Sequence, residues 1–257
     1  MPRKKLAPYE MHEVAYKKIK AAGGLHWADR AGSGDETPID KELLEYLSSI
    51  LRKPWAKARD SVLEIGCGSA VLLRWLLSQG FSCGTGIDVS KSAIELAQEQ
   101  SEGLPVLLKK HDHLSSLVTE PDYFDFIVDG HCLHCITNEN DRETFFSNAY
   151  KLLKPNGVLV VSTMCSPVNG KKMREDFSHA LYKKGTHYYS FSGGENYSGA
   201  IEQDGKYYVP QRYFEHWQNI LRRVRRKGFA ILDFHYSAAV NNDDLCSHLH
   251  VAAKKSM

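Results

Sequence analysis

The sequence predicts an α/β fold, in which a mostly parallel sheet carries helices on both faces. Short apolar runs that suit buried strands alternate along the chain with segments that have an apolar helical face. The first such strand is followed at once by the turn Gly66-Cys67-Gly68 and then by a helical segment. Strands that alternate with helices form βαβ units, and such units build parallel sheets.

The order of the elements follows from the same patterns. Pro38 introduces the second helix, and Pro155-Asn156-Gly157 ends the fifth helix before the fifth strand. The last two strands are expected to form an antiparallel pair that closes the sheet edge. The expected strands are residues 62–65, 83–87, 105–109, 124–129, 157–164, 229–237 and 245–253. The expected helices are residues 9–22, 39–52, 70–79, 91–100, 141–153 and 211–227.

Composition limits the class of protein. The 257 residues are 42% hydrophobic and 25% charged, which is typical of a globular domain. The net charge of +2 is too small to indicate a nucleic-acid partner. No apolar run approaches the roughly 20 residues of a membrane span, and the basic N-terminus lacks the apolar core of a secretory signal. The six cysteines do not look like a disulfide framework, so we expect reduced thiols and a cytoplasmic location.

The unit around the glycine turn has the features of a site for a ribose-containing ligand. Asp88 ends the second expected strand, where a carboxylate can accept hydrogen bonds from both hydroxyls of a ribose. A dinucleotide site would have the pattern Gly-x-Gly-x-x-Gly, but Val71 stands at the third glycine position. The chain also has an acid, Glu64, two residues before the first glycine.

The combination Glu64-x-Gly66-x-Gly68 with a later Asp88 resembles the class I S-adenosylmethionine (SAM)-dependent methyltransferases. The resemblance covers about residues 40–257 and implies a Rossmann-like, seven-stranded, mostly parallel sheet with an antiparallel edge strand. It also implies SAM as cofactor and S-adenosylhomocysteine (SAH) as product. In this family the glycine turn lies against the methionine part of SAM, the acid before the turn contacts the amino-acid end, and the later acid holds the ribose. The residues that the resemblance assigns to the cofactor here are Glu64, Gly66, Cys67, Gly68, Asp88 and Val89.

Two later strand ends complete the cofactor site that the resemblance implies. In the family, an acid after the third strand accepts from the adenine amino group and the next residue touches the ring, which implies Asp112 and His113. The alternatives are a turn acid and a solvent-facing histidine. After the fourth strand, Asp129 and Gly130 are expected beside the methyl group. A metal site at His111-x-His113 lacks a third ligand at a diagnostic spacing, so no metal is expected.

His131 and His134 are the candidates for catalysis. Their spacing of three residues places them on one face of a turn or helix after the fourth strand. The preceding Tyr-Phe-Asp-x-Ile-x-Asp and the Leu-His pair resemble small-molecule methyltransferases, which implies that both histidines point toward the acceptor. A neutral imidazole there can take the acceptor's proton near pH 7. The alternative for His134 is a packed, hydrogen-bonded histidine, and Cys132 and Cys135 are expected to be buried small apolar residues.

The polar, tyrosine-rich segment 165–210 is expected to form a lid or wall over the substrate, or else an insertion that packs on the surface. Tyr188 and Tyr189 in this segment, and Trp27 in an N-terminal flap, are the candidates for substrate contacts. We expect one methyltransferase domain, residues 1–257, with four parts. These are the N-terminal helices and flap (1–52), the SAM-binding core (53–164), the lid-like segment (165–210), and the C-terminal helix and strand pair (211–257).

The expected function is methyl transfer from SAM to a small-molecule acceptor. The basic run from Arg222 to Lys227 is explained most simply as a solvated helix face. A protein or RNA substrate would need a more basic active-site mouth than the near-neutral composition suggests. A methyltransferase acting on protein or RNA, and a SAM-binding pseudoenzyme or sensor, stay open as alternatives. The sequence does not indicate the acceptor atom or the oligomeric state.

Overall fold

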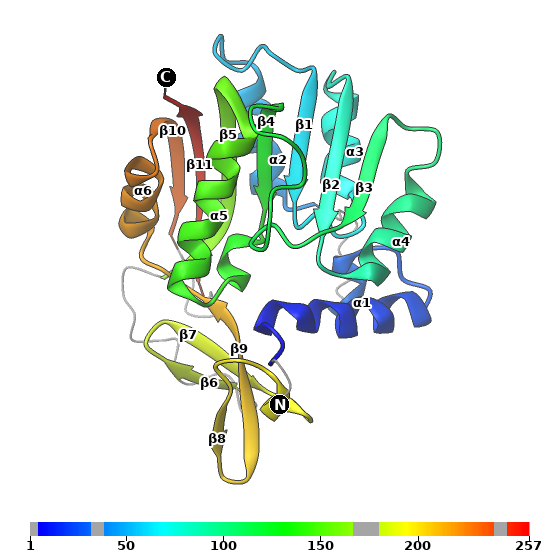
Figure 1. Ribbon diagram of the computed structural model, residues 1–257, viewed down its shortest axis with the longest axis vertical. Coiled ribbons are helices and arrows are strands. Elements are labelled where there is room, and N and C mark those ends of the chain that lie inside the picture. Colours follow the sequence, from blue (N-terminus) through cyan, green and yellow to red (C-terminus); the bar gives the residue numbers. More distant parts are fainter. Residues whose placement is uncertain (1–4, 32–38, 167–179, 239–245, 257) are drawn as a thin grey trace.

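The computed structural model describes residues 5–31, 39–166, 180–238 and 246–256. These residues contain a seven-stranded sheet of order β10-β11-β5-β4-β1-β2-β3, shown in Figure 1. Neighbouring strands from β3 to β5 in this order are all parallel, which confirms the expected α/β fold. The strands are β1 (Ser61–Ile65), β2 (Cys83–Asp88), β3 (Val106–Lys110), β4 (Phe124–Gly130), β5 (Leu153–Cys165), β10 (Phe229–Ser237) and β11 (Ser247–Lys255).

The antiparallel strand of the sheet is β11. It pairs antiparallel with β5 on one side and with β10 on the other, so it lies one position inside the edge. The register pairs Val251 with Val161 of β5 and with Phe234 of β10. Through this pairing β11 places His248 beside Met164, close to the end of β5.

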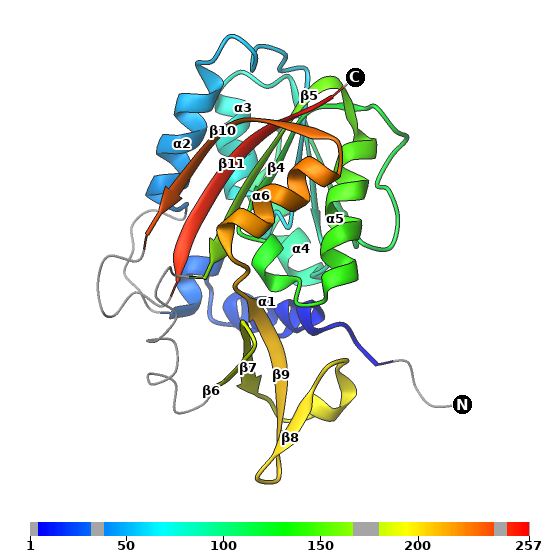
Figure 2. The same cartoon turned by 90° about the vertical axis from the view of Figure 1, so that its left-hand side faces the viewer.

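Helices cover both faces of the sheet, as Figure 2 shows from the side. On one face, α2 and α3 bury leucines such as Leu47 and Leu73 against apolar side chains of β1 and β4. On the other face, α5 and α6 bury Phe145, Phe146 and Val224 against the same sheet. The helices are α1 (His12–Ala21), α2 (Lys41–Leu51), α3 (Val71–Ser78), α4 (Lys91–Gln100), α5 (Glu139–Leu152) and α6 (Trp217–Arg226), with short 3-10 turns η1 (Pro8–Met11), η2 (Trp27–Ala31), η3 (Leu133–Cys135) and η4 (Gly194–Asn196).

The segment expected as a lid contains a second sheet. Its strands, in the order β6-β7-β9-β8, pair antiparallel below the main sheet in Figure 1. They are β6 (Ala180–Lys183), β7 (Thr186–Ser190), β8 (Ile201–Gln203) and β9 (Lys206–Tyr213). The expectation of a helix over 211–227 is therefore wrong at its start, because Arg212 and Tyr213 pair with β7 and the helix begins at Trp217.

The N-terminal helix α1 lies across the carboxyl ends of the parallel strands, between them and the second sheet (Figure 1). Its Tyr16 and Ile19 pack against Ala93 and Leu96 of α4. The six cysteines are all free, which agrees with the expected reduced thiols. Across the described residues, every helix is too short or too polar to cross a membrane.

Candidate active site

A cavity of about 750 Å3 opens at the carboxyl ends of the parallel strands, beside α1 and the end of β9. In an open parallel sheet this is where ligands bind, at the point where the strand order reverses between β1 and β4. Most of the residues predicted for the site line it. They are Trp27, Glu64, Gly66, Cys67, Gly68, Asp88, Val89, Asp112, His113, Gly130, His131 and His134.

The glycine turn after β1 has a backbone shape that other residues adopt only with strain. Gly66 and Gly68 have φ values of 69° and 52°, in the left-handed region. A Cβ on Gly68 would lie 2.2 Å from the Tyr16 hydroxyl, and one on Gly66 would lie 2.8 Å from the Cβ of Cys132. The turn is held to β2 because the backbone amides of Gly66 and Cys67 both donate to the carbonyl of Ile87.

Asp88 connects the glycine turn to the end of β2. Its carboxylate accepts from the backbone amides of Gly68 at 2.9 Å and of Ser90 at 2.8 Å. Burial raises the pKa of Asp88 to about 6, although these two hydrogen bonds act in the opposite direction. Each carboxylate oxygen has a second lone pair, so Asp88 can also accept from a ligand in the cavity.

Glu64 lies on the other side of the turn. Its carboxylate accepts from the backbone amide of Leu73 at 2.9 Å, in the first turns of α3. Its other oxygen faces Gly130, where a Cβ would come within 3.9 Å of it. Burial raises the pKa of Glu64 well above its ordinary value. A cationic group of a ligand, such as an ammonium, is the natural partner for a carboxylate in this position.

Asp112 and His113 follow β3 and differ in what they can offer. Asp112 accepts from the Tyr9 hydroxyl at 3.1 Å and from the Leu114 amide at 2.9 Å. The His113 Nε2 lies 3.0 Å from the carbonyl of Phe145, to which it donates, and burial lowers the pKa of His113 to about 4. His113 is thus a packed neutral histidine and not the solvent-facing one weighed above.

The structure does not bring Asp129, Tyr188 and Tyr189 into the cavity. Asp129 is fully buried, and its carboxylate accepts from the backbone amides of Cys132 at 2.6 Å and Leu133 at 3.0 Å. It therefore shapes the turn after β4 instead of facing a ligand. The two tyrosines belong to β7, which pairs with β6 on one side and with β9 on the other. They do not line this cavity, so it gives no support to the prediction that they contact the substrate.

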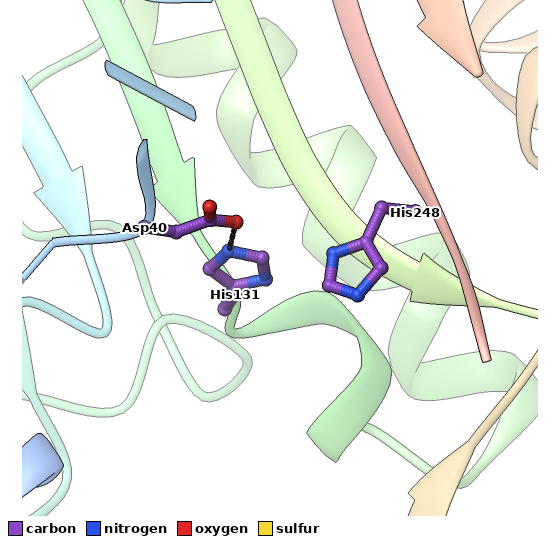
Figure 3. Close-up of side chains that lie close together, drawn as sticks. All are labelled: Asp40, His131 and His248. Carbon is purple, nitrogen blue, oxygen red and sulfur yellow. Dashed lines mark hydrogen bonds and ion pairs between the residues drawn. The ribbon is translucent and has the colours of Figure 1, made fainter. Parts of the chain in front are cut away.

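His131 has an unusual backbone and a carboxylate partner. Its φ of 75° lies in the left-handed region, which few residues other than glycine adopt. The backbone amide donates to the Ser162 carbonyl at 3.0 Å, and the ring Nε2 donates to Asp40 Oδ2 at 3.1 Å (Figure 3). The hydrogen bond with His131 lowers the pKa of Asp40 to about 2. Asp40 is itself fixed as the N-cap of α2, because its other oxygen accepts from the Glu42 amide at 2.9 Å.

His134 lies in the cavity wall but is packed more deeply than His131. It is buried, and its Nδ1 accepts from the Met164 amide at 3.5 Å. Burial lowers the pKa of His134 well below its ordinary value, with Arg212 acting in the same direction. These contacts fit the alternative interpretation of His134 as a packed, hydrogen-bonded histidine.

Several residues that line the cavity were missed in the sequence. Two of them contact Trp27: the centroid of its ring lies 5.3 Å from that of Tyr16 and 5.2 Å from that of His12. Tyr9, His12 and Tyr16 belong to the expected helix 9–22 and Asp40 to the start of the next one, but no sequence pattern indicates that their side chains face the site. The others lie far along the chain from the glycine turn, and no spacing rule connects them to it. The missed residues with polar side chains include Tyr9, His12, Tyr16, His26, Asp40, Lys41, Arg212 and His248.

Comparison with known proteins agrees with this geometry. Residues 62–157 match the methyltransferase domain family. The mitochondrial ubiquinone biosynthesis O-methyltransferase of Schizosaccharomyces pombe is 27% identical over 124 residues, which are 47% of this chain and 44% of that protein. The EEF1A lysine methyltransferase 2 of Danio rerio is 30% identical over 131 residues, which are 46% of this chain and 55% of that protein. The chain thus spans less than two thirds of the length of either relative.

The fold has solved counterparts as well. An S-adenosylmethionine-dependent methyltransferase from Clostridium acetobutylicum superimposes with a TM-score of 0.64 at 16% identity, over 94% of this chain and 99% of that one. Such low identity establishes the fold alone. The chain thus shares its fold with that protein, and its residues 62–157 are similar to the methyltransferase domain family.

Proposed function

We propose that this chain transfers a methyl group from SAM to a small-molecule acceptor. The observation that carries the proposal is that one cavity contains both the glycine turn with its two acids and, farther along, His131 with Asp40. Cofactor and acceptor can therefore meet inside a single cavity. Aromatic side chains of α1 and η2, and Arg212 of β9, border that space.

The cofactor would take the half of the cavity beside β1, β2 and β3. Asp88 would accept from the ribose hydroxyls, Glu64 would face the ammonium end, and Gly66 to Gly68 would let the chain approach the methionine part. Asp112 and His113 would border the adenine. This arrangement supports SAM binding because each polar group has a ligand-facing position in the cavity wall.

The acceptor would lie beside Gly130 and His131. Methyl transfer is an in-line displacement at a carbon already activated by its sulfonium, so the protein has to align the acceptor and help remove its proton. His131, held by Asp40, is the residue that we propose for this side. His134 is a weaker candidate because its Nδ1 already accepts from the backbone.

Two alternatives stay open, and the first of them has specific support. The Danio rerio relative is named a lysine methyltransferase, which favours a protein substrate. A SAM-binding sensor would use the same cofactor residues without turnover. Incubating the chain with SAM labelled on its methyl group, and with the ultrafiltered and retained fractions of a cell extract, separates these cases. Label in small molecules supports the proposal, label in protein or RNA favours the first alternative, and no label with intact SAH binding favours the sensor.

The cofactor assignment has a direct test. SAM and SAH should bind and NAD should not, because Val71 replaces the glycine that a dinucleotide site uses. Isothermal titration calorimetry with all three ligands measures this. Binding of NAD without binding of SAM would overturn the assignment.

Replacing Asp88 tests the ribose site. Asp88→Ala should weaken SAH binding by about 1–3 kcal/mol, the range for leaving buried polar groups without a partner. Both the ribose and the Gly68 amide would lose their acceptor. Asp60→Ala is the matched control, since Asp60 is exposed and lies outside the cavity. Unchanged affinity in folded Asp88→Ala would place the ribose elsewhere.

A further inference from the structure

Three side chains from distant parts of the chain converge on the acceptor side of the cavity. They are Asp40 at the start of α2, His131 after β4, and His248 of β11, shown in Figure 3. One ligand atom from each lies within 4.8 Å of the other two. All three residues line the cavity. Two imidazole nitrogens and one carboxylate oxygen are a common ligand set for a divalent transition metal.

We propose that Asp40, His131 and His248 bind a divalent cation of the Zn2+ class at the methyl-acceptor site. The distance between His131 Nε2 and Asp40 Oδ2 is 3.1 Å. Two ligands of a tetrahedral zinc ion, each about 2.0–2.1 Å from it, lie about 3.3 Å apart. A cation can therefore replace the proton that these two atoms share, and the proton leaves to solvent. His248 closes the set with a small movement of its ring.

The local structure fixes the two closest ligands before any ion binds. Asp40 Oδ1 is held by the Glu42 amide, which leaves Oδ2 toward His131. The left-handed backbone of His131, tied to the Ser162 carbonyl, aims its ring at the same point. Strained backbone of this kind is concentrated at functional sites.

The third ligand comes from the sheet itself. His248 pairs in register with Met164 of β5 and with Ser237 of β10, so its backbone position is fixed on both sides. Its ring centroid lies 5.8 Å from that of His131, with the planes at 77°. Mg2+ and Ca2+ prefer sites made entirely of oxygen, so this mixed set selects against them.

The catalytic role of such a cation rests on the proposed function, methyl transfer to a small molecule. The cation would also restrict the class of acceptor. Three protein ligands leave a coordination position for a substrate oxygen. An acceptor hydroxyl, such as that of a phenol or a vicinal diol, would bind there as an oxyanion after losing its proton to solvent. The oxygen lone pair then forms a bond to the methyl carbon, the carbon–sulfur bond breaks, and its electron pair stays on sulfur in neutral SAH. The products are the methyl ether and SAH.

The test uses the full chain, stripped with a chelator and dialysed. Zn2+ is titrated in competition with a chromophoric chelator, Co2+ is titrated by visible absorption, and SAH binding is measured on the same samples. The test variants are Asp40→Asn and His248→Gln. The matched control is His235→Gln, since His235 is an exposed histidine of β10 outside the cavity.

We expect one Zn2+ per chain in the wild type and in His235→Gln. In both test variants we expect a Zn2+ affinity lower by about 10²-fold or more, because loss of a metal ligand should cost at least as much as loss of a group that hydrogen-bonds to a ligand. No stoichiometric Zn2+ binding by the wild type, or unchanged affinity in the test variants, would overturn the metal site. If a variant does not fold and therefore does not bind SAH, the Co2+ absorption spectrum of the wild type decides which residues bind the ion. Nitrogen and oxygen ligation supports the site, and thiolate ligation places the ion at Cys132 and Cys135 instead. Failure of the wild type to bind SAH would contradict the proposed function and not the metal site.

Discussion

Replacing His131 with alanine is expected to lower kcat by about 10²–10⁴-fold, the contribution of a positioned acid–base group, while SAH affinity stays nearly unchanged. His131 lines the cavity in the part that we propose for the acceptor. Loss of its imidazole removes the group that we propose to face the acceptor, and Asp40 loses its hydrogen-bond partner. Steady-state kinetics on the acceptor, with calorimetry for SAH, measure both quantities.

The backbone of His131 requires a second variant. Alanine at a φ of 75° is itself strained, by roughly 1–2 kcal/mol, whereas asparagine tolerates the left-handed region. His131→Asn therefore removes the imidazole and keeps the turn. If kcat falls equally in both variants, loss of the imidazole ring, and not backbone strain, causes the fall. If only KM rises, His131 orients the acceptor without taking part in proton removal. Wild-type kcat and KM in both would remove His131 from the reaction.

The main sheet could be predicted because its signals are local. Val62 to Ile65 and Phe124 to Val128 are apolar runs bounded by turns, and the structure buries them as β1 and β4. The second sheet could not be predicted in this way. β7 and β9 have intermediate burial along much of their length and mix tyrosines with polar residues, and in β9 also with charged ones, so no alternation reveals them. Their pairing with each other, and not their own apolar pattern, defines them.

The site divides in the same manner. Glu64, Gly66, Gly68 and Asp88 lie within 25 residues of chain and form one βαβ unit, so their spacing alone places them together. The acceptor side is assembled from distant segments. His131 meets Asp40 across 91 residues of sequence, and their contact depends on how α2 packs on the sheet. No spacing rule for a single unit predicts such a contact.

The basic run before β10 shows where a pattern of charge misleads. The expectation of a solvated helix face is wrong for Arg223, whose side chain is only 5% exposed. Arg223 Nη2 donates to Glu215 Oε1 at 2.9 Å, and Arg142 Nε lies 3.5 Å from the other oxygen of the same carboxylate. The Glu215 carboxylate, itself buried, therefore lies between two buried guanidinium groups of α5 and α6.

Glu215→Ala is expected to lower the free energy of unfolding by about 3–5 kcal/mol, the range for removing one partner of a buried ion pair. The variant leaves the buried Arg142 guanidinium without its carboxylate partner, and a buried charge without a partner is costly. Arg223 loses its buried carboxylate but keeps its ion pairs with Glu143 and Glu139. Glu215 also lies in the short connection between β9, which ends at Tyr213, and α6, so its loss should loosen the connection between the second sheet and α6. Urea denaturation, followed by circular dichroism, measures the change as a lower midpoint.

The matched control is Glu45→Ala on α2. Glu45 is 3.9 Å from Lys41, and both side chains are mostly exposed, so the pair is screened by water. Its loss should change stability by no more than about 0.5 kcal/mol. Glu215→Gln should fall between the two, because the amide oxygen still accepts from one arginine but carries no charge. A Glu215→Ala variant as stable as Glu45→Ala would mean that water replaces the carboxylate and that the two arginines do not depend on it.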